Sequence, residues 1–101
     1  MTNRELIALI ERRPLTFVSH HSLSELEAFI NGYNYHRFVS GELENIDADY
    51  KRFVDSWIYS RLNVVDKKGW KEAILQSCES EEAAFRLFFD LWHEYIAQVG
   101  P

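Results

Sequence analysis

Residues 80–99 carry apolar and aromatic side chains at steps of three and four. A helix gathers such positions on one face, whereas a half-buried strand requires a step of two. Ser80 can cap this helix, and Glu81 and Glu82 suit its positive first turn. Gly100 and Pro101 then end it. The apolar face is wide enough for the central helix of an all-helical bundle, and it comprises Phe85, Phe88, Phe89, Trp92, Tyr95, Ile96 and Val99.

A capping box predicts the first helix of the chain. Thr2 and Glu5 form this box, and the apolar residues that follow recur at helical spacing. The helix should end near Arg12, because Pro14 disfavours helical geometry at the residue before it. We expect residues 15–19 to be extended.

A second capping box, Ser22 with Glu25, predicts a helix that runs to Gly41. Apolar residues define one face of it, and three more could prolong the stripe toward its end. The first group is Leu23, Leu26, Ile30 and Tyr33, and the second is Tyr35, Phe38 and Val39.

The third predicted helix begins near Asp47, after an acidic connector, and its apolar positions are Tyr50, Phe53, Val54, Trp57, Ile58 and Leu62. A loop at residues 63–66 follows, and Asp66 can cap a short fourth helix. No segment alternates as a strand would. The sequence therefore predicts one domain over residues 1–101, an all-α, compact bundle of about five helices with no β-sheet.

The composition is rich enough in apolar residues for a hydrophobic core. Of the 101 residues, 47% are hydrophobic and 15% aromatic, so the chain can fold without disulfides or metal. Cys78 is the only cysteine, which is typical of a reducing compartment. The N-terminus lacks the basic and apolar runs of a signal peptide, and no stretch is apolar enough to span a bilayer. We expect a cytoplasmic protein that does not use a membrane.

Candidate catalytic and metal-binding residues find no partners in the sequence. His20 and His21 precede a helix with no other ligand at metal-binding spacing, and His36 stands alone. His93-Glu94 begins like a zinc-protease helix, but Ala97 stands where the second histidine would be required. Cys78 follows apolar positions and reads as a small core residue. Since no glycine-rich phosphate loop is present either, we predict no enzyme, no cofactor and no metal.

The charge balance argues against nucleic acid as a partner. The formal net charge is −5, and phosphate binding needs a surplus of Lys and Arg on at least one face. A helix-turn-helix protein would also need exposed basic or amide residues on its recognition helix. The third predicted helix does carry Lys51, Arg52 and Arg61, but neighbouring aspartates cancel them.

The densest group of acids comprises Glu42, Glu44, Asp47, Asp49 and Asp55. Two interpretations remain open. These residues could be solvated loop and helix-capping acids. They could instead form a patch that meets a basic protein and raises its association rate.

The order of these landmarks resembles small helical bacterial immunity proteins, which accompany polymorphic toxins, including those of contact-dependent growth inhibition. In the first half the similar residues are Arg13-Pro14-Leu15-Thr16-Phe17, Ser22-Leu23, Leu26, Phe29-Ile30 and Gly32-Tyr33. In the second half they are Phe53, Trp57, Gly69-Trp70, Ile74, Glu81, Ala84-Phe85 and Phe88-Phe89. Relatives often have glycine where this chain has Leu15 and Ser19, so the turn before the second helix can differ.

The resemblance implies that the chain binds a cognate toxin domain in the cytoplasm and blocks its active site. Such toxins are often nucleases with basic active sites, and a small RNase, of the EndoU type, is the expected partner. The toxin-binding residues would then be the five acids, Glu42, Glu44, Asp47, Asp49 and Asp55. The alternative from another class is a helical adaptor or regulator that binds a cellular protein or self-associates.

Overall fold

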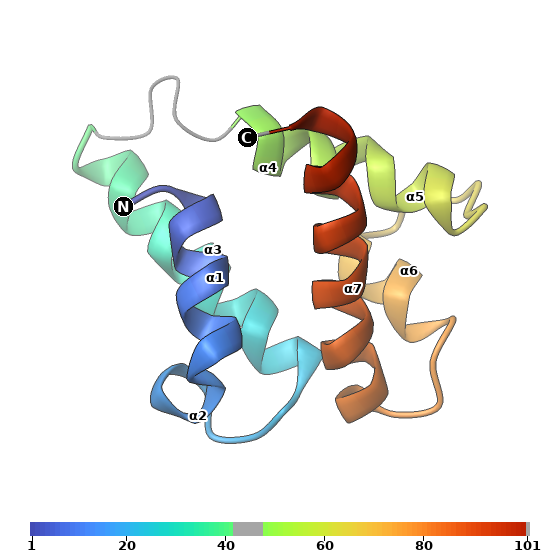
Figure 1. The fold of residues 1–101 in the computed structure, drawn as a ribbon, viewed down its shortest axis with the longest axis horizontal. Coiled ribbons are helices and arrows are strands. Elements are labelled where there is room, and N and C mark those ends of the chain that lie inside the picture. Colours follow the sequence, from blue (N-terminus) through green and yellow to red (C-terminus); the bar gives the residue numbers. More distant parts are fainter. Residues whose placement is uncertain (42–47, 101) are drawn as a thin grey trace.

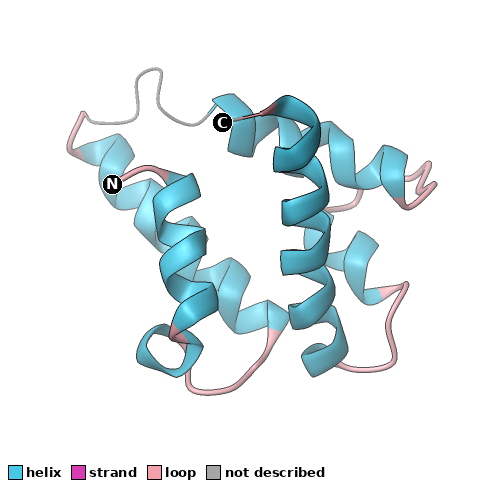
Figure 2. Cartoon of the chain, viewed as in Figure 1, coloured by secondary structure: helices cyan, strands magenta, loops and turns pink. Residues whose placement is uncertain are grey.

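Every regular element in the described part of the chain is a helix (Figures 1 and 2). The computed structural model describes residues 1–41 and 48–100, and these contain no strand and six helices, one of which consists of three consecutive segments. The all-α fold is thus confirmed, with one helix more than expected. The Cα radius of gyration is 13.2 Å, close to the roughly 13 Å of a folded chain of this length.

The first helix is α1 (Asn3–Arg12), with the predicted capping box at its start. The Thr2 hydroxyl accepts from the Glu5 N–H at 3.1 Å, and the Glu5 carboxylate accepts from the Thr2 N–H at 3.1 Å. The predicted extended segment at residues 15–19 is wrong, because Pro14 begins a one-turn helix, α2 (Pro14–Phe17). Proline disfavours helix at the residue before it but suits the first position of a new helix.

Helix α3 (Leu23–Val39) is capped by Ser22 and ends where Gly41 takes a φ of +75°. Leu23, Leu26 and Ile30 are fully buried, as predicted. The prolongation of this stripe is wrong, since the large apolar residues of the last turns are exposed. Tyr35 lies five residues after Ile30, about 140° farther around a helix of 3.6 residues per turn, and so on another face.

Helices α4 (Ala48–Arg52) and α5 (Ile58–Arg61) are joined without a break by a π-helical turn, η1 (Phe53–Trp57). The Ile58 N–H reaches back five residues to the Phe53 carbonyl. The wider turn brings Phe53, Val54 and Ile58 into the core together. The Ser56 hydroxyl donates to the Arg52 carbonyl at 3.1 Å, so this side chain supports the turn. Asp47, the predicted start of this helix, lies outside the described residues.

Helix α6 (Trp70–Leu75) begins later than predicted. Asp66 does not cap it; its carboxylate lies 3.3 Å from the Lys68 ammonium, and Gly69 stands at the cap position with a φ of +134°. The chain enters this helix through a backbone angle that favours glycine. The last helix, α7 (Glu81–Val99), has the predicted Ser80 cap and ends at Gly100.

Helix α7 lies between α1 and α3 on one side and η1, α5 and α6 on the other (Figure 1). Its aromatic face meets Phe53 of η1, whose ring centroid is 5.7 Å from that of Phe88 and 4.9 Å from that of Trp92. Phe53, Phe85, Phe88 and Trp92 are buried as predicted, while Trp57 is only half-buried. Its indole N–H donates to the Gln98 side chain at 3.1 Å.

Candidate functional site

The predicted acidic cluster is only partly described. Glu42, Glu44 and Asp47 lie outside the described residues. Asp49 is half-buried and its carboxylate lies 3.2 Å from the Arg4 guanidinium, which also donates to the Gly100 carbonyl at 3.1 Å. Asp49 therefore helps to join α1, α4 and the end of α7. Asp55 is exposed on η1.

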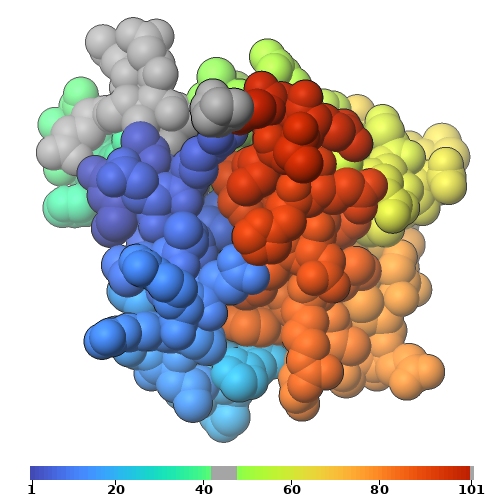
Figure 3. Space-filling view, viewed as in Figure 1, coloured from blue at the N-terminus to red at the C-terminus, as the bar shows by residue number. Residues whose placement is uncertain are grey.

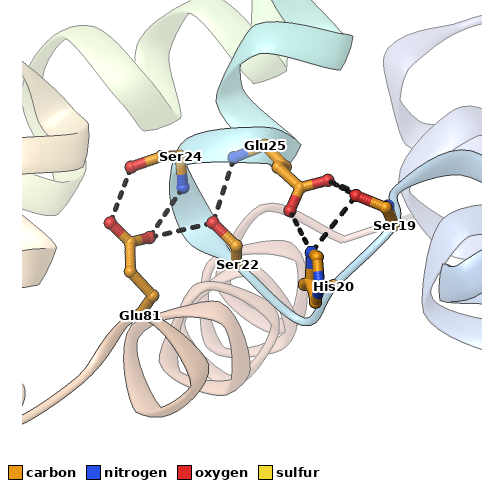
Figure 4. Close-up of polar contacts among 6 residues, drawn as sticks. All are labelled: Ser19, His20, Ser22, Ser24, Glu25 and Glu81. Carbon is orange, nitrogen blue, oxygen red and sulfur yellow. Dashed lines mark hydrogen bonds and ion pairs between the residues drawn. The ribbon is translucent and has the colours of Figure 1, made fainter.

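A serine, a histidine and a carboxylate meet just before α3 (Figure 4). The Ser19 hydroxyl donates to Glu25 at 2.6 Å, and both residues lie 3.2 Å from the same His20 nitrogen, Nδ1. A catalytic triad needs the serine at one ring nitrogen and the acid at the other. Hydrogen bonds from Ser19 also lower the pKa of Glu25. The arrangement orders the turn before α3 and lacks the geometry of a nucleophilic site.

Glu81 ties the start of α7 to the start of α3 (Figure 4). It accepts from the Ser24 N–H at 2.9 Å, from the Ser24 hydroxyl at 2.7 Å and from the Ser22 hydroxyl at 3.2 Å. These bonds satisfy a donor in the first turn of α3, where the helix itself offers no acceptor. The hydrogen bonds from the Ser24 backbone and side chain lower the pKa of Glu81.

His21, His93 and Cys78 have structural surroundings, and His36 is exposed on α3. His93 Nε2 lies 2.8 Å from Glu11 and links α7 to α1, and the His21 ring stacks 5.4 Å from that of Phe85. Cys78 is half-buried against the core, where burial raises the pKa of its thiol. Within residues 1–41 and 48–100, no three potential ligands are grouped to hold a metal ion.

The outer face of α3, by which we mean Ala28, Asn31, Gly32, Tyr35, Phe38 and Val39, is exposed and carries three large apolar side chains. Tyr35, Phe38 and Val39 are 69%, 64% and 60% exposed. None of the six residues is charged, although 27% of the chain is Asp, Glu, Lys or Arg. Large apolar side chains gathered on a surface in this way mark protein–protein contact sites.

The opposite side of the same turns is firmly held, so the exposure is not the result of a fraying helix end. Arg37 is 2% exposed and donates to the side chain of Asn3 at 3.1 Å. Its guanidinium lies 5.3 Å from the centre of the Tyr33 ring. The Tyr33 hydroxyl donates to the Met1 carbonyl, and Figure 3 shows the end of α3 beside the N-terminal residues. Tyr33 thus packs its ring and pairs its hydroxyl.

The sequence did not reveal the outer face of α3, because its large residues, Tyr35, Phe38 and Val39, were interpreted as a prolongation of the core stripe. The signal was present for Tyr35 and Val39, which lie about 120–180° from Leu23 and Ile30 on a helix of 3.6 residues per turn. Phe38 lies nearer, about 60–80° from the same two residues. When a helix is apolar on two sides and the core covers only one of them, the other side is a candidate for contact with another protein.

Comparisons with known proteins add no relatives: no family model, no curated protein and no solved structure matches this chain. Among the described residues, no helix is long and apolar enough to cross a membrane.

Proposed function

We propose that this chain is an immunity protein that binds a cognate toxin domain of the nuclease type in the cytoplasm and occludes its active site. The observation that carries the proposal is the exposed apolar end of α3. Tyr35 and Phe38 are exposed for more than three-fifths of their surface, and aromatic side chains are the commonest energetic anchors of protein interfaces.

The charge of the chain supports a basic partner. Acidic residues follow the apolar end of α3 directly in the sequence, beginning with Glu42 and Glu44. An acidic chain with an exposed apolar helix end complements a nuclease, because a nuclease site is basic where it holds phosphates. Attraction between opposite charges speeds the encounter, and the apolar contacts then hold the complex.

Asp49 and Asp55 have different parts in this proposal. Asp49 is already paired with Arg4, so it contributes to the local field while it holds the fold. Asp55 is exposed and can meet a partner directly. Glu42 and Glu44 are therefore the better probes of binding, because changing Asp49 would confuse folding with recognition.

The alternative function is a helical adaptor that binds a cellular protein. The same apolar face would serve it, so the charge of the partner separates the two functions. A toxin gene beside this one favours immunity, and co-purification of the two products tests it.

The test is the association rate of the purified toxin domain encoded beside this chain. Replacing Glu42 and Glu44 by Lys should slow association by about tenfold at low salt and much less at high salt, because salt screens the attraction. The matched control is Glu79→Lys/Asp90→Lys, which changes the net charge equally with two exposed acids of other surfaces. Equal rates for the two double variants would contradict a role for the acids after α3.

A further inference from the structure

The outer face of α3 has small residues in its first half and large ones in its second. Ala28, Gly32, Tyr35 and Val39 follow each other at steps of four, three and four, so they form one line along the helix. Nothing lies within 4 Å of the position that a Gly32 side chain would take. We propose that this face pairs with the same face of a second copy of the chain.

The line is complementary to itself under a two-fold axis. If two copies of α3 pack antiparallel around a point midway between Gly32 and Tyr35, each Tyr35 meets Gly32 of the other copy. Each Val39 then meets Ala28 in the same way. A two-fold interface requires this property, since one surface must fit a copy of itself. Glycine at the crossing also lets the two helix axes approach closely.

The lack of charge on the face lets a second copy pack against it without burying a charged group. The face spans about 17 Å of helix without one charged residue, so no ion pair is broken or left buried when two copies meet. The antiparallel arrangement also opposes the two helix dipoles.

The available area sets the strength of this dimer. Exposures of 60–69% leave on the order of 100 Å² on each of Tyr35, Phe38 and Val39. One copy thus offers roughly 300–400 Å², against about 800 Å² per partner in an interface of standard size. The dimer is therefore weak, with a dissociation constant of about 10 to 1,000 µM.

Self-association and toxin binding then compete, because both use Tyr35 and the end of α3. Salt distinguishes them. Two copies that each carry a net charge of −5 repel, so salt strengthens the dimer, whereas salt weakens the complex with a basic partner. The self-association can be measured without any toxin, so its failure leaves the proposed function standing.

Sedimentation equilibrium of the purified chain tests the proposal at concentrations from about 10 µM to about 1 mM and at two salt concentrations. The mean mass should rise from that of the monomer toward twice that value, and rise earlier at high salt. Gly32→Glu and Val39→Glu should each raise the dissociation constant by at least about tenfold. Both positions are exposed, so the monomer fold tolerates the changes.

The control is Ala97→Glu, which adds the same charge at an exposed position of α7. It should leave the dissociation constant within about twofold of that of the unchanged chain. A monomer at every concentration and salt would overturn the proposal. A dimer that Gly32→Glu does not weaken would overturn it too, because the contact would then lie elsewhere.

Discussion

The hydroxyls of Tyr33 and Tyr95 differ in hydrogen bonding. The Tyr33 hydroxyl donates to the Met1 carbonyl at the edge of the fold. Tyr95 is 1% exposed, its ring lies 5.3 Å from Phe53 and 5.5 Å from Trp57, and its hydroxyl has no partner in the described part of the chain. A buried hydroxyl without a partner costs free energy, whereas a paired one contributes.

Tyr95→Phe should therefore leave the free energy of unfolding unchanged or raise it by up to about 1 kcal/mol. Tyr33→Phe removes the same atom from a paired site and should lower it by up to about 1 kcal/mol. Urea denaturation of the two variants measures the difference. A loss from Tyr95→Phe that exceeds the loss from Tyr33→Phe would show that the buried hydroxyl is bonded.

Glu81 makes the free energy of unfolding depend on pH in the acidic range. Its pKa is lowered from 4.5 in the folded chain, so its contribution to stability is complete above about pH 4.5. The contribution is lost as the pH falls through the folded pKa, because the protonated group is a poorer acceptor for Ser24.

Glu81→Gln should lower the free energy of unfolding by about 0.5–1 kcal/mol at pH 7, a value that allows for solvent screening at this exposed site. The difference from the unchanged chain should shrink below pH 4.5. Glu79→Gln removes a neighbouring exposed carboxylate and serves as the control. A difference that stays constant from pH 7 to about pH 3 would contradict the assigned role.

At the scale of the elements, apolar periodicity and caps identified most helices. Thr2, Ser22 and Ser80 cap helices where the sequence predicts them, because each cap depends on residues within the next turn. Local rules did not predict the π turn from Phe53 to Trp57. In that turn Phe53 packs against Phe88 and Trp92, which are distant in the sequence.

The aromatic contact between η1 and α7 should dominate stability. Phe88 is fully buried, so Phe88→Ala should cost about 3–5 kcal/mol. Trp57 keeps part of its ring in solvent, and Trp57→Ala should cost less, about 1–3 kcal/mol. Thermal and urea unfolding of both variants rank them, and a larger loss at Trp57 would contradict the observed burial.

Gly32 in α3 and Gly41 just after it should respond in opposite ways to replacement by alanine. Gly32 lies inside the helix with open space around it, so Gly32→Ala should raise the free energy of unfolding by about 0.5–1 kcal/mol. Gly41 ends the helix with a φ of +75°, and Gly41→Ala should lower it by about 1 kcal/mol. Helicity and urea midpoints of the pair provide the measurement. Stabilisation by both variants would show that the positive φ at Gly41 is not required.

At the scale of the molecule, the all-α fold could be predicted but the candidate site could not. Core residues repeat with the period of a helix, so the sequence reveals them. A binding face depends on which side of α3 the other helices leave uncovered, and that is decided by tertiary packing. The five acids were chosen by density in the sequence alone, and the structure pairs one of them, Asp49, with Arg4.

The central claim is that the chain binds another protein through the end of α3. The most direct measurement is the dissociation constant for the toxin domain encoded beside this chain, determined calorimetrically for Tyr35→Ala/Phe38→Ala. Leu15→Ala is the control, because Leu15 is 63% exposed, much as Phe38 is, but lies on α2. The claim predicts that the double variant raises the dissociation constant by at least about tenfold while the control leaves it unchanged. Equal dissociation constants for the two variants and the unchanged chain would contradict it.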